Sequence, residues 1–186
     1  PSTVDDVLTT IVDANNAIFR AAADNADQRG MGTTVTALFV VHAATVPDSE
    51  LTPSPGGDNA GTITGEIPAV VTEEAFVVVN VGDSRTYLLR NGRLRRLSTD
   101  HNYVQELVSA GHITEEEART HPRRNIITKA LGIDPNVRID AWTIPIVRGD
   151  RFLLCSDGLS DELRDNEITA LLTANDDPDT AARELI

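Results

Sequence analysis

The segment from Arg151 to Asp161 constrains the fold of this chain more than any other, because an apolar run ends there in a carboxylate beside a glycine. Residues 152–155 are all apolar, and a short hydrophobic run bounded by turn residues is typical of an interior β-strand. Functional side chains concentrate where rigid strands run out into loops. We therefore predict that Asp157 lies at the end of a buried strand, a placement that a metal site requires, and that Gly158 permits a tight turn behind it.

Residues 81–85 repeat this arrangement. Val81-Gly82-Asp83-Ser84-Arg85 again follows apolar residues, here from Ala75 to Val79. Asp-Gly and Gly-Asp pairs most often make only turns, so a turn is the simpler interpretation of either segment taken alone.

The remaining patterns divide the chain into strand runs joined by turns, with helices gathered toward its ends. Thr3 is placed to cap a helix whose apolar stripe reaches Ala22, and Asp177 with Pro178 begins a helix that continues to Ile186. The predicted strands are 33–41, 76–81, 85–90 and 93–97 (a hairpin around Asn91-Gly92), a half-buried strand through Val137, Ile139 and Ala141, and the run at Phe152. This order favours a layered α+β domain over alternating βαβ units.

Three further regions are predicted between and after these strands. The segment from His101 to Arg124 carries two short helices, Tyr103 to Ala110 and Thr114 to Arg119, the second opened by a capping box. Pro47 to Gly65 is rich in proline and glycine without apolar periodicity, which predicts an irregular surface loop. Asp165 is expected to cap a helix that contains Ile168, Leu171 and Leu172.

Composition limits the function classes only broadly. The chain has 186 residues, 40% of them hydrophobic, which suits one globular domain with a substantial core. Its formal charge of -13 argues against a general nucleic-acid binder, because affinity for the phosphate backbone comes from clustered Lys and Arg. No apolar stretch reaches the roughly 20 residues that a membrane span needs. The single cysteine, Cys155, lies in an apolar run and is interpreted as a structural thiol rather than a nucleophile.

Several motifs occur in a fixed order along the chain. They are Gly30-Met31-Gly32-Thr33-Thr34, Val81-Gly82-Asp83-Ser84-Arg85-Thr86-Tyr87, Leu97-Ser98-Thr99-Asp100-His101, His121-Pro122-Arg123-Arg124-Asn125 with Thr128-Lys129-Ala130-Leu131-Gly132, and Leu154-Cys155-Ser156-Asp157-Gly158-Leu159. Together they resemble the metal-dependent serine/threonine protein phosphatases, the PPM or type-2C family, and most of all its bacterial, actinobacterial members. The similarity runs from about Thr3 to Ile186.

The resemblance implies a central antiparallel β-sandwich between helical layers, with metal ions at one end of the sandwich. It also implies the hydrolysis of phosphoserine and phosphothreonine in proteins by attack of a metal-activated water. Divalent ions can lower the pKa of bound water from 15.7 to about 7. Mn²⁺ or Mg²⁺ is the cofactor that this implies, with two core ions in a complete domain and a third left open.

The resemblance also assigns expected roles to single residues. Asp157 matches the aspartate that binds one of the core ions, and Asp83 matches the aspartate of a weaker, additional metal position. Gly82, Ser84 and Arg85 are expected to shape and anchor the turn rather than touch the substrate.

In the resembled family, the helical segment 101–124 is a flap beside the active-site cleft. Its basic residues could meet a phosphorylated substrate, or they could pair with acidic neighbours at 115–117, and both interpretations stay open. These basic residues are Arg119, His121, Arg123 and Arg124. His101 and His121 could assist proton transfer, although ordinary surface histidines are the commoner case.

The chain departs from the family pattern at both ends. The early acidic residue, the Asp-Gly-Met-Gly-Gly motif, the phosphate-contacting arginine and the terminal Asp-Asn motif have no counterparts in it. We therefore expect residues 1–186 to form one phosphatase-like domain, incomplete at both ends, with weak or absent catalysis by the segment alone. The alternative is a catalytically inactive pseudophosphatase or a protein-binding module that keeps the scaffold.

Partners and location are implied only through the resemblance. Phosphorylated proteins are the expected substrates, and a cognate serine/threonine kinase is an expected partner. We expect a cytoplasmic monomer, with any membrane anchor of the parent protein outside this segment.

Overall fold

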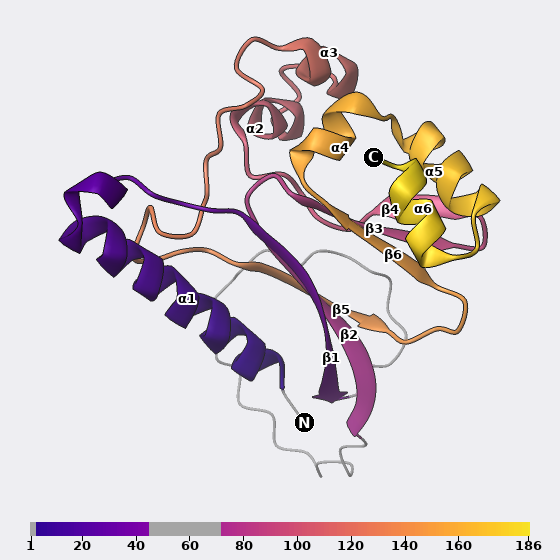
Figure 1. The fold of residues 1–186 in the computed structure, drawn as a ribbon, viewed down its shortest axis with the longest axis horizontal. Helices are drawn as coiled ribbons and strands as arrows, with labels where there is room; N and C mark the ends of the chain where they lie inside the picture. Colours follow the sequence, from indigo (N-terminus) through magenta and orange to yellow (C-terminus); the bar gives the residue numbers. More distant parts are fainter. Residues whose placement is uncertain (1–2, 45–71) are drawn as a thin grey trace.

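The computed structural model describes residues 3–44 and 72–186, which form two facing sheets with helices outside them (Figure 1). The predicted surface loop at residues 47–65 lies outside these ranges. The elements, in order, are α1 (Val4–Asp24), η1 (Ala26–Gln28), β1 (Val35–Ala44), β2 (Thr72–Val81), β3 (Arg85–Arg90), β4 (Arg93–Arg96), α2 (Tyr103–Ser109), α3 (Glu115–Thr120), β5 (Asp140–Pro145), β6 (Arg151–Cys155), α4 (Asp157–Glu162), α5 (Asp165–Ala174) and α6 (Pro178–Glu184).

The first sheet has the strand order β1-β2-β5, with every neighbour antiparallel. Val35 pairs with Val81 and Ala75 pairs with Pro145, so β2 is central. Helix α1 covers one face, where Val7 and Ile11 pack against alternate valines of β2. Those valines are Val77, Val79 and Val81, each fully buried. Thr3 caps α1 as predicted, and Thr3 and Asp6 also form a capping box, with hydrogen bonds of 2.8 and 3.2 Å.

The second sheet has the strand order β4-β3-β6. Asn91 and Gly92 have φ angles of 52° and 71°, which confirms the predicted tight turn between β3 and β4. The outer face of this sheet is covered by α5 and α6, whose buried residues share one cluster with Tyr87 and Leu89. The helical members of that cluster are Ile168, Leu172, Ala181 and Leu185.

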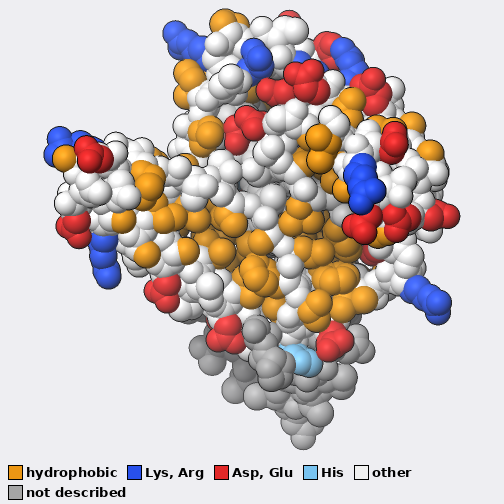
Figure 2. Space-filling model, viewed as in Figure 1, with side chains coloured by type: hydrophobic (Ala, Val, Ile, Leu, Met, Phe, Trp, Pro, Cys, Tyr) orange, Lys and Arg blue, Asp and Glu red, His pale blue; other side chains and the backbone are white. Residues whose placement is uncertain are grey.

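The two sheets face each other, and both polar and apolar side chains make contacts between them. The Thr36 hydroxyl lies 2.7 Å from the Thr86 hydroxyl, and the rings of Phe76 and Phe152 meet edge to face at 5.0 Å. Helix α1 lies outside one sheet and α5 with α6 outside the other (Figure 1). On the face shown in Figure 2, hydrophobic side chains gather over the middle strands and charged ones lie mainly around them. The expected α+β sandwich between helical layers is therefore confirmed.

Several local predictions were wrong in detail. Strand β6 is an edge strand of its sheet within the described residues, and Leu154 is 39% exposed, so this run is not an interior strand. Gly158 does not make a tight turn, because it is the second residue of α4 and has no positive φ. Asp165 is the first residue of α5, and the N-cap is Arg164.

The strand predicted through residues 137–141 begins only at Asp140. Val137 and Ile139 do pack against the core under α1. Ala141, however, is exposed. Among the described residues, no helix combines the length and the apolar character that a membrane crossing requires.

Candidate functional site

A cleft of about 700 Å³ opens at one end of the sandwich. It is formed by the turn between β2 and β3, the residues that follow β4, the α2–α3 segment, and the start of α4 and α5. Its acidic lining is Asp83, Asp100, Glu115, Glu116, Asp157, Asp161, Glu162 and Asp165, and its basic lining is Arg85, Arg96, Arg119, Arg124 and Arg164. Carboxylates and guanidinium groups therefore line the same polar cleft.

Asp83 and Asp157, the two aspartates singled out in the sequence, both line this cleft. Asp83 is 7% exposed in the turn after β2, whereas Asp157 is exposed at the first position of α4. Burial raises the pKa of the Asp83 carboxyl, and the negative charge of Asp157 raises it further. The charges of Asp100 and Asp161 act in the same direction. The two sheets thus bring several carboxylates within electrostatic reach of one another.

The turn that carries Asp83 is shaped by its neighbours. Gly82 has a φ of +109°, and a Cβ at this position would lie 2.3 Å from the Thr34 Cγ2 atom. The Ser84 hydroxyl lies 2.9 Å from the Thr34 hydroxyl. Only glycine fits this conformation and this close approach, and Ser84 ties the turn to the start of β1.

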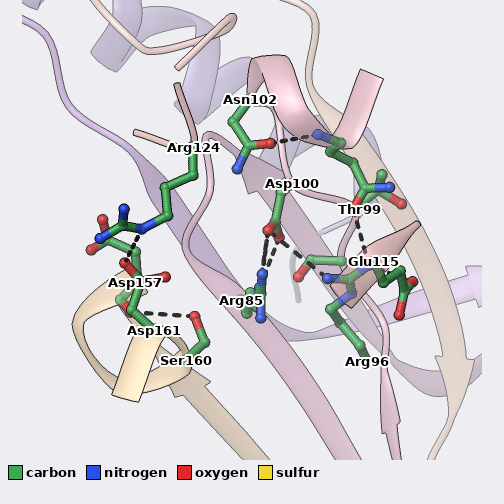
Figure 3. A network of polar contacts seen from close by, with 12 residues as sticks. Arg85, Arg96, Thr99, Asp100, Asn102, Glu115, Arg124, Asp157, Ser160 and Asp161 are labelled. Carbon is green, nitrogen blue, oxygen red and sulfur yellow. Dashed lines mark hydrogen bonds and ion pairs between the residues drawn. The ribbon is translucent and has the colours of Figure 1, made fainter. Parts of the chain in front are cut away.

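Arg85 is directed at Asp100 rather than into open space (Figure 3). Its Nε donates to Asp100 Oδ1 at 3.0 Å and its Nη2 donates to Oδ2 at 2.6 Å. Its Nη1 also donates to the Tyr87 hydroxyl at 3.2 Å. Burial lowers the pKa of Arg85, but the hydrogen bonds and charge of Asp100 outweigh burial and raise it.

The four basic residues of segment 101–124 separate into two pairs. Arg119 donates to the carbonyl oxygens of Ser160 and Asp161 at 3.2 Å each. Arg124 Nε lies 3.8 Å from the Asp161 carboxylate (Figure 3). Arg123 instead lies over the Tyr103 ring, 5.7 Å from its centre. The His121 ring is 6.0 Å from the same ring. Arg119 and Arg124 line the cleft, and His121 and Arg123 do not.

The acidic residues at 115–117 do not take these basic residues as partners. Within the described residues, Glu115 pairs with Arg96 at 3.9 Å and Glu116 pairs with Arg164 at 2.9 Å. Glu117 completes the capping box of α3 with Thr114.

Some residues of the cleft received no role from the sequence. Asp100, Asp161, Arg96 and Arg164 are examples. Asp161 follows Asp157 by four residues, one turn of a helix, so a helical interpretation of this segment would have placed both on one face. His101 is also different from the expectation of a surface histidine, because its side chain is only 4% exposed.

The residues of the cleft fit a hard divalent cation in their chemistry. Oxygen ligands from carboxylates suit Mg²⁺ and Mn²⁺. Burial raises the pKa of Asp83 and the charge of Asp157 raises it further, and a bound cation would favour the ionised form of both carboxylates. Within residues 3–44 and 72–186, no group of three or more His, Cys, Asp or Glu side chains is arranged closely enough to enclose an ion. The fit rests on Asp83 and Asp157.

Comparisons with known proteins agree with this geometry. A family model described as Protein phosphatase 2C matches residues 63–177. The serine/threonine phosphatase stp of Listeria monocytogenes is 35% identical over 163 residues, which is 88% of this chain and 52% of that protein. The chain thus spans about half the length of this curated relative.

Solved structures show the same relationship. The serine/threonine phosphatase Stp1 from Staphylococcus aureus superposes with a TM-score of 0.75 at 33% identity, over 98% of this chain and 60% of that one. The catalytic domain of the serine threonine protein phosphatase PstP, solved in complex with 2 manganese ions, superposes with a TM-score of 0.72 at 31% identity, over 99% of this chain and 64% of that one. The chain therefore belongs to the protein phosphatase 2C family.

Proposed function

We propose that this chain acts in a metal-dependent protein phosphatase that hydrolyses phosphoserine and phosphothreonine. The observation that carries the proposal is the buried Asp83, which lies in the field of Asp157 in a cleft that also presents arginine side chains. Carboxylates that lie close together destabilise the folded protein unless a cation binds them. Clusters of carboxylates with perturbed pKa values are therefore typical of functional sites. The family membership supports the same activity.

The cation would be held by Asp157 and Asp83. Mn²⁺ or Mg²⁺ fits their oxygen donors, and the two manganese ions of the PstP structure support two ions in a complete domain, with a third left open. When bound, such an ion supplies the Lewis acidity that makes water a nucleophile toward a phosphoester at neutral pH.

The protein's own side chains would hold and orient the phosphoryl group. Arg119 and Arg124 line the same cleft as the carboxylates, beside α4, and guanidinium groups recognise phosphate oxygens through charge-assisted hydrogen bonds. Arg124 is 45% exposed and pairs only loosely with Asp161, so it is free to turn toward a phosphate. His121 and Arg123, farther from the cleft, are placed to meet the protein part of a substrate.

The proposal also extends to the domain organisation, the substrates and the partners of this chain. Segment 101–124 would act as a flap over the cleft, and residues 1–186 would form one phosphatase-like domain. Phosphorylated proteins would be the substrates, and a serine/threonine kinase would supply them. We infer a cytoplasmic monomer. The alternative of a pseudophosphatase is not favoured, because the relatives are named as phosphatases.

Hydrolysis of a phosphothreonine peptide tests the proposal. We expect the phosphatase in which this chain acts to release phosphate only with Mn²⁺ or Mg²⁺, and its Asp157→Ala variant to release none at any metal concentration. Asp13→Ala, at an exposed position of α1, is the matched control and should behave as the wild type. Activity that survives Asp157→Ala would refute the metal role of this residue.

A further inference from the structure

His101 is buried beside the Asp83 turn, between β5 and the base of the α2–α3 segment. Its side chain is 4% exposed, and its two ring nitrogens have different partners. The Gly82 backbone N–H donates to Nδ1 at 3.1 Å, and Nε2 lies 3.0 Å from Asp140 Oδ2. Asp140 is the first residue of β5, so the ring bridges the Asp83 turn and the neighbouring strand.

These partners fix the tautomer of the ring. A backbone N–H can only donate, so Nδ1 must carry a lone pair, and the proton of a neutral imidazole must then be on Nε2. That proton points at the Asp140 carboxylate, which can only accept when ionised. The His101 hydrogen bond is also the main reason why the pKa of Asp140 is lowered, against the effect of its burial.

His101 forms hydrogen bonds with both backbone polar groups of Gly82. The His101 backbone N–H donates to the Gly82 carbonyl at 2.9 Å, while its ring accepts from the Gly82 N–H. Asn80 adds a second donor to that carbonyl at 3.1 Å. Gly82 has a φ of +109° and directly precedes Asp83, so these contacts fix the direction in which the Asp83 carboxylate leaves the turn.

The backbone around His101 also closes the base of the α2–α3 segment. Thr128 N–H donates to the His101 carbonyl at 2.8 Å, and Tyr103 N–H donates to the Ile126 carbonyl at 2.9 Å. Asn102 caps α2 and forms a β-bridge with Ile127. The two flanking residues, Asp100 and Asn102, point toward Arg85 and toward α2 in Figure 3.

We propose that His101 is a positioning residue that sets the direction of Asp83 in the cleft shared with Asp157 and couples this direction to the base of the α2–α3 segment. Asp140 is the group that holds the His101 ring in the required tautomer and orientation. This inference rests on the proposed metal-dependent function, because the direction of the Asp83 side chain matters for activity only if Asp83 binds a metal ion. His101 is buried and does not line the cleft, so it would not touch the substrate or the ion.

Two substitutions of His101 test the contacts of its two ring nitrogens separately. His101→Asn can keep an acceptor near the position of Nδ1 for the Gly82 N–H, whereas His101→Gln extends to the position of Nε2 and keeps only the donor to Asp140. His112→Gln, at an exposed position of the same segment, is the control for loss of a histidine. For each protein, Mn²⁺ affinity is measured by calorimetry and exchange of the Gly82 amide hydrogen by NMR.

We expect His101→Gln to weaken Mn²⁺ binding by about tenfold or more and to speed exchange at Gly82, as loss of a residue behind a metal ligand does. His101→Asn should recover most of both properties, and His112→Gln should match the wild type. Equal effects of the Asn and Gln substitutions on Mn²⁺ affinity would overturn the proposal, because a merely structural histidine would not distinguish them.

The wild-type ring gives a test that does not depend on metal or on the folding of a variant. We expect ¹⁵N chemical shifts to show the Nε2–H tautomer at neutral pH, together with a protected Gly82 amide. An Nδ1–H tautomer with a rapidly exchanging Gly82 amide would overturn the proposal. A wild-type chain without Mn²⁺ affinity would instead contradict the proposed function, and the tautomer and amide exchange would still decide the role of His101 at the turn.

Discussion

Arg85 and Asp100 form a bidentate ion pair in the cleft, beside the turn that carries Asp83. The two bonds measure 3.0 and 2.6 Å, and the Asp100 side chain is only 4% exposed. Arg96 approaches the same carboxylate at 3.9 Å, too far to replace the fork geometry of Arg85. This pair ties β3 to the segment that leads into α2.

Replacing Arg85 by Met should destabilise the fold. The substitution leaves a buried carboxylate with only a distant partner, and breaking a buried pair in this way costs about 3 kcal/mol or somewhat more. The free energy of unfolding, measured by urea denaturation, checks this. Arg164→Ala removes an exposed pair with Glu116 and should cost about 1 kcal/mol or less. Equal losses in the two variants would contradict the structural role of Arg85.

Gly82→Ala should be more harmful than Gly92→Ala, although both glycines have positive φ. Position 92 is open, so alanine there costs only the backbone penalty of about 1 kcal/mol. At position 82 the added carbon also meets Thr34 Cγ2, which raises the expected loss to about 2 to 4 kcal/mol. Thr34→Ser removes that methyl group and keeps the hydroxyl, so it should partly rescue Gly82→Ala. Absence of rescue would show that the close approach is not the cause.

The stability of the metal-free chain should depend on the protonation of Asp83. Burial and the charge of Asp157 raise its pKa in the folded state above the ordinary value of 3.8, so the folded chain binds this proton more tightly than the unfolded chain. The stabilisation is complete below 3.8 and is lost as the pH rises through the raised pKa. The free energy of unfolding of Asp83→Asn, minus that of the wild type, should therefore increase as the pH rises from 4 toward 7. Unfolding curves in EDTA from pH 4 to 7 measure this difference, and its absence would contradict the electrostatic coupling.

Cys155 should react slowly with alkylating reagents. Its burial raises the pKa of the thiol to about 11, and the thiolate is the reactive form. At pH 8 we expect the folded protein to be alkylated far more slowly than the same protein in urea, with the rate rising as the pH approaches 11. Equally fast reaction of folded and unfolded protein would refute the assignment of Cys155 as a structural thiol.

The features that the sequence predicted best are those set by a few adjacent residues. The turn at Asn91-Gly92, the N-cap at Thr3 and the capping box at Thr114 depend on local φ angles and local hydrogen bonds, so their signals are contained in short segments. The apolar stripe of α1 also predicted its buried face, which reaches Ala22 as expected.

The features that it missed are set by contacts between distant segments. The apolar run of β6 carries no signal of whether the strand is central or at an edge, which explains why the exposure of Leu154 was not foreseen. Arg119 binds carbonyl oxygens 41 and 42 residues away in α4, and no spacing in the sequence indicates such a partner. His101 has a side-chain partner 39 residues away, so its burial could not be read from its polar neighbours.

A titration of Mn²⁺ into the chain tests most directly whether Asp157 and Asp83 form the cation-binding end of the sandwich. We predict that the wild type binds Mn²⁺, that Asp157→Asn loses at least about tenfold in affinity for the tightest ion, and that Asp83→Asn weakens an additional, looser ion by a similar factor. Asp13→Asn should bind as the wild type does. Unchanged Mn²⁺ binding in both Asp157→Asn and Asp83→Asn would contradict the account.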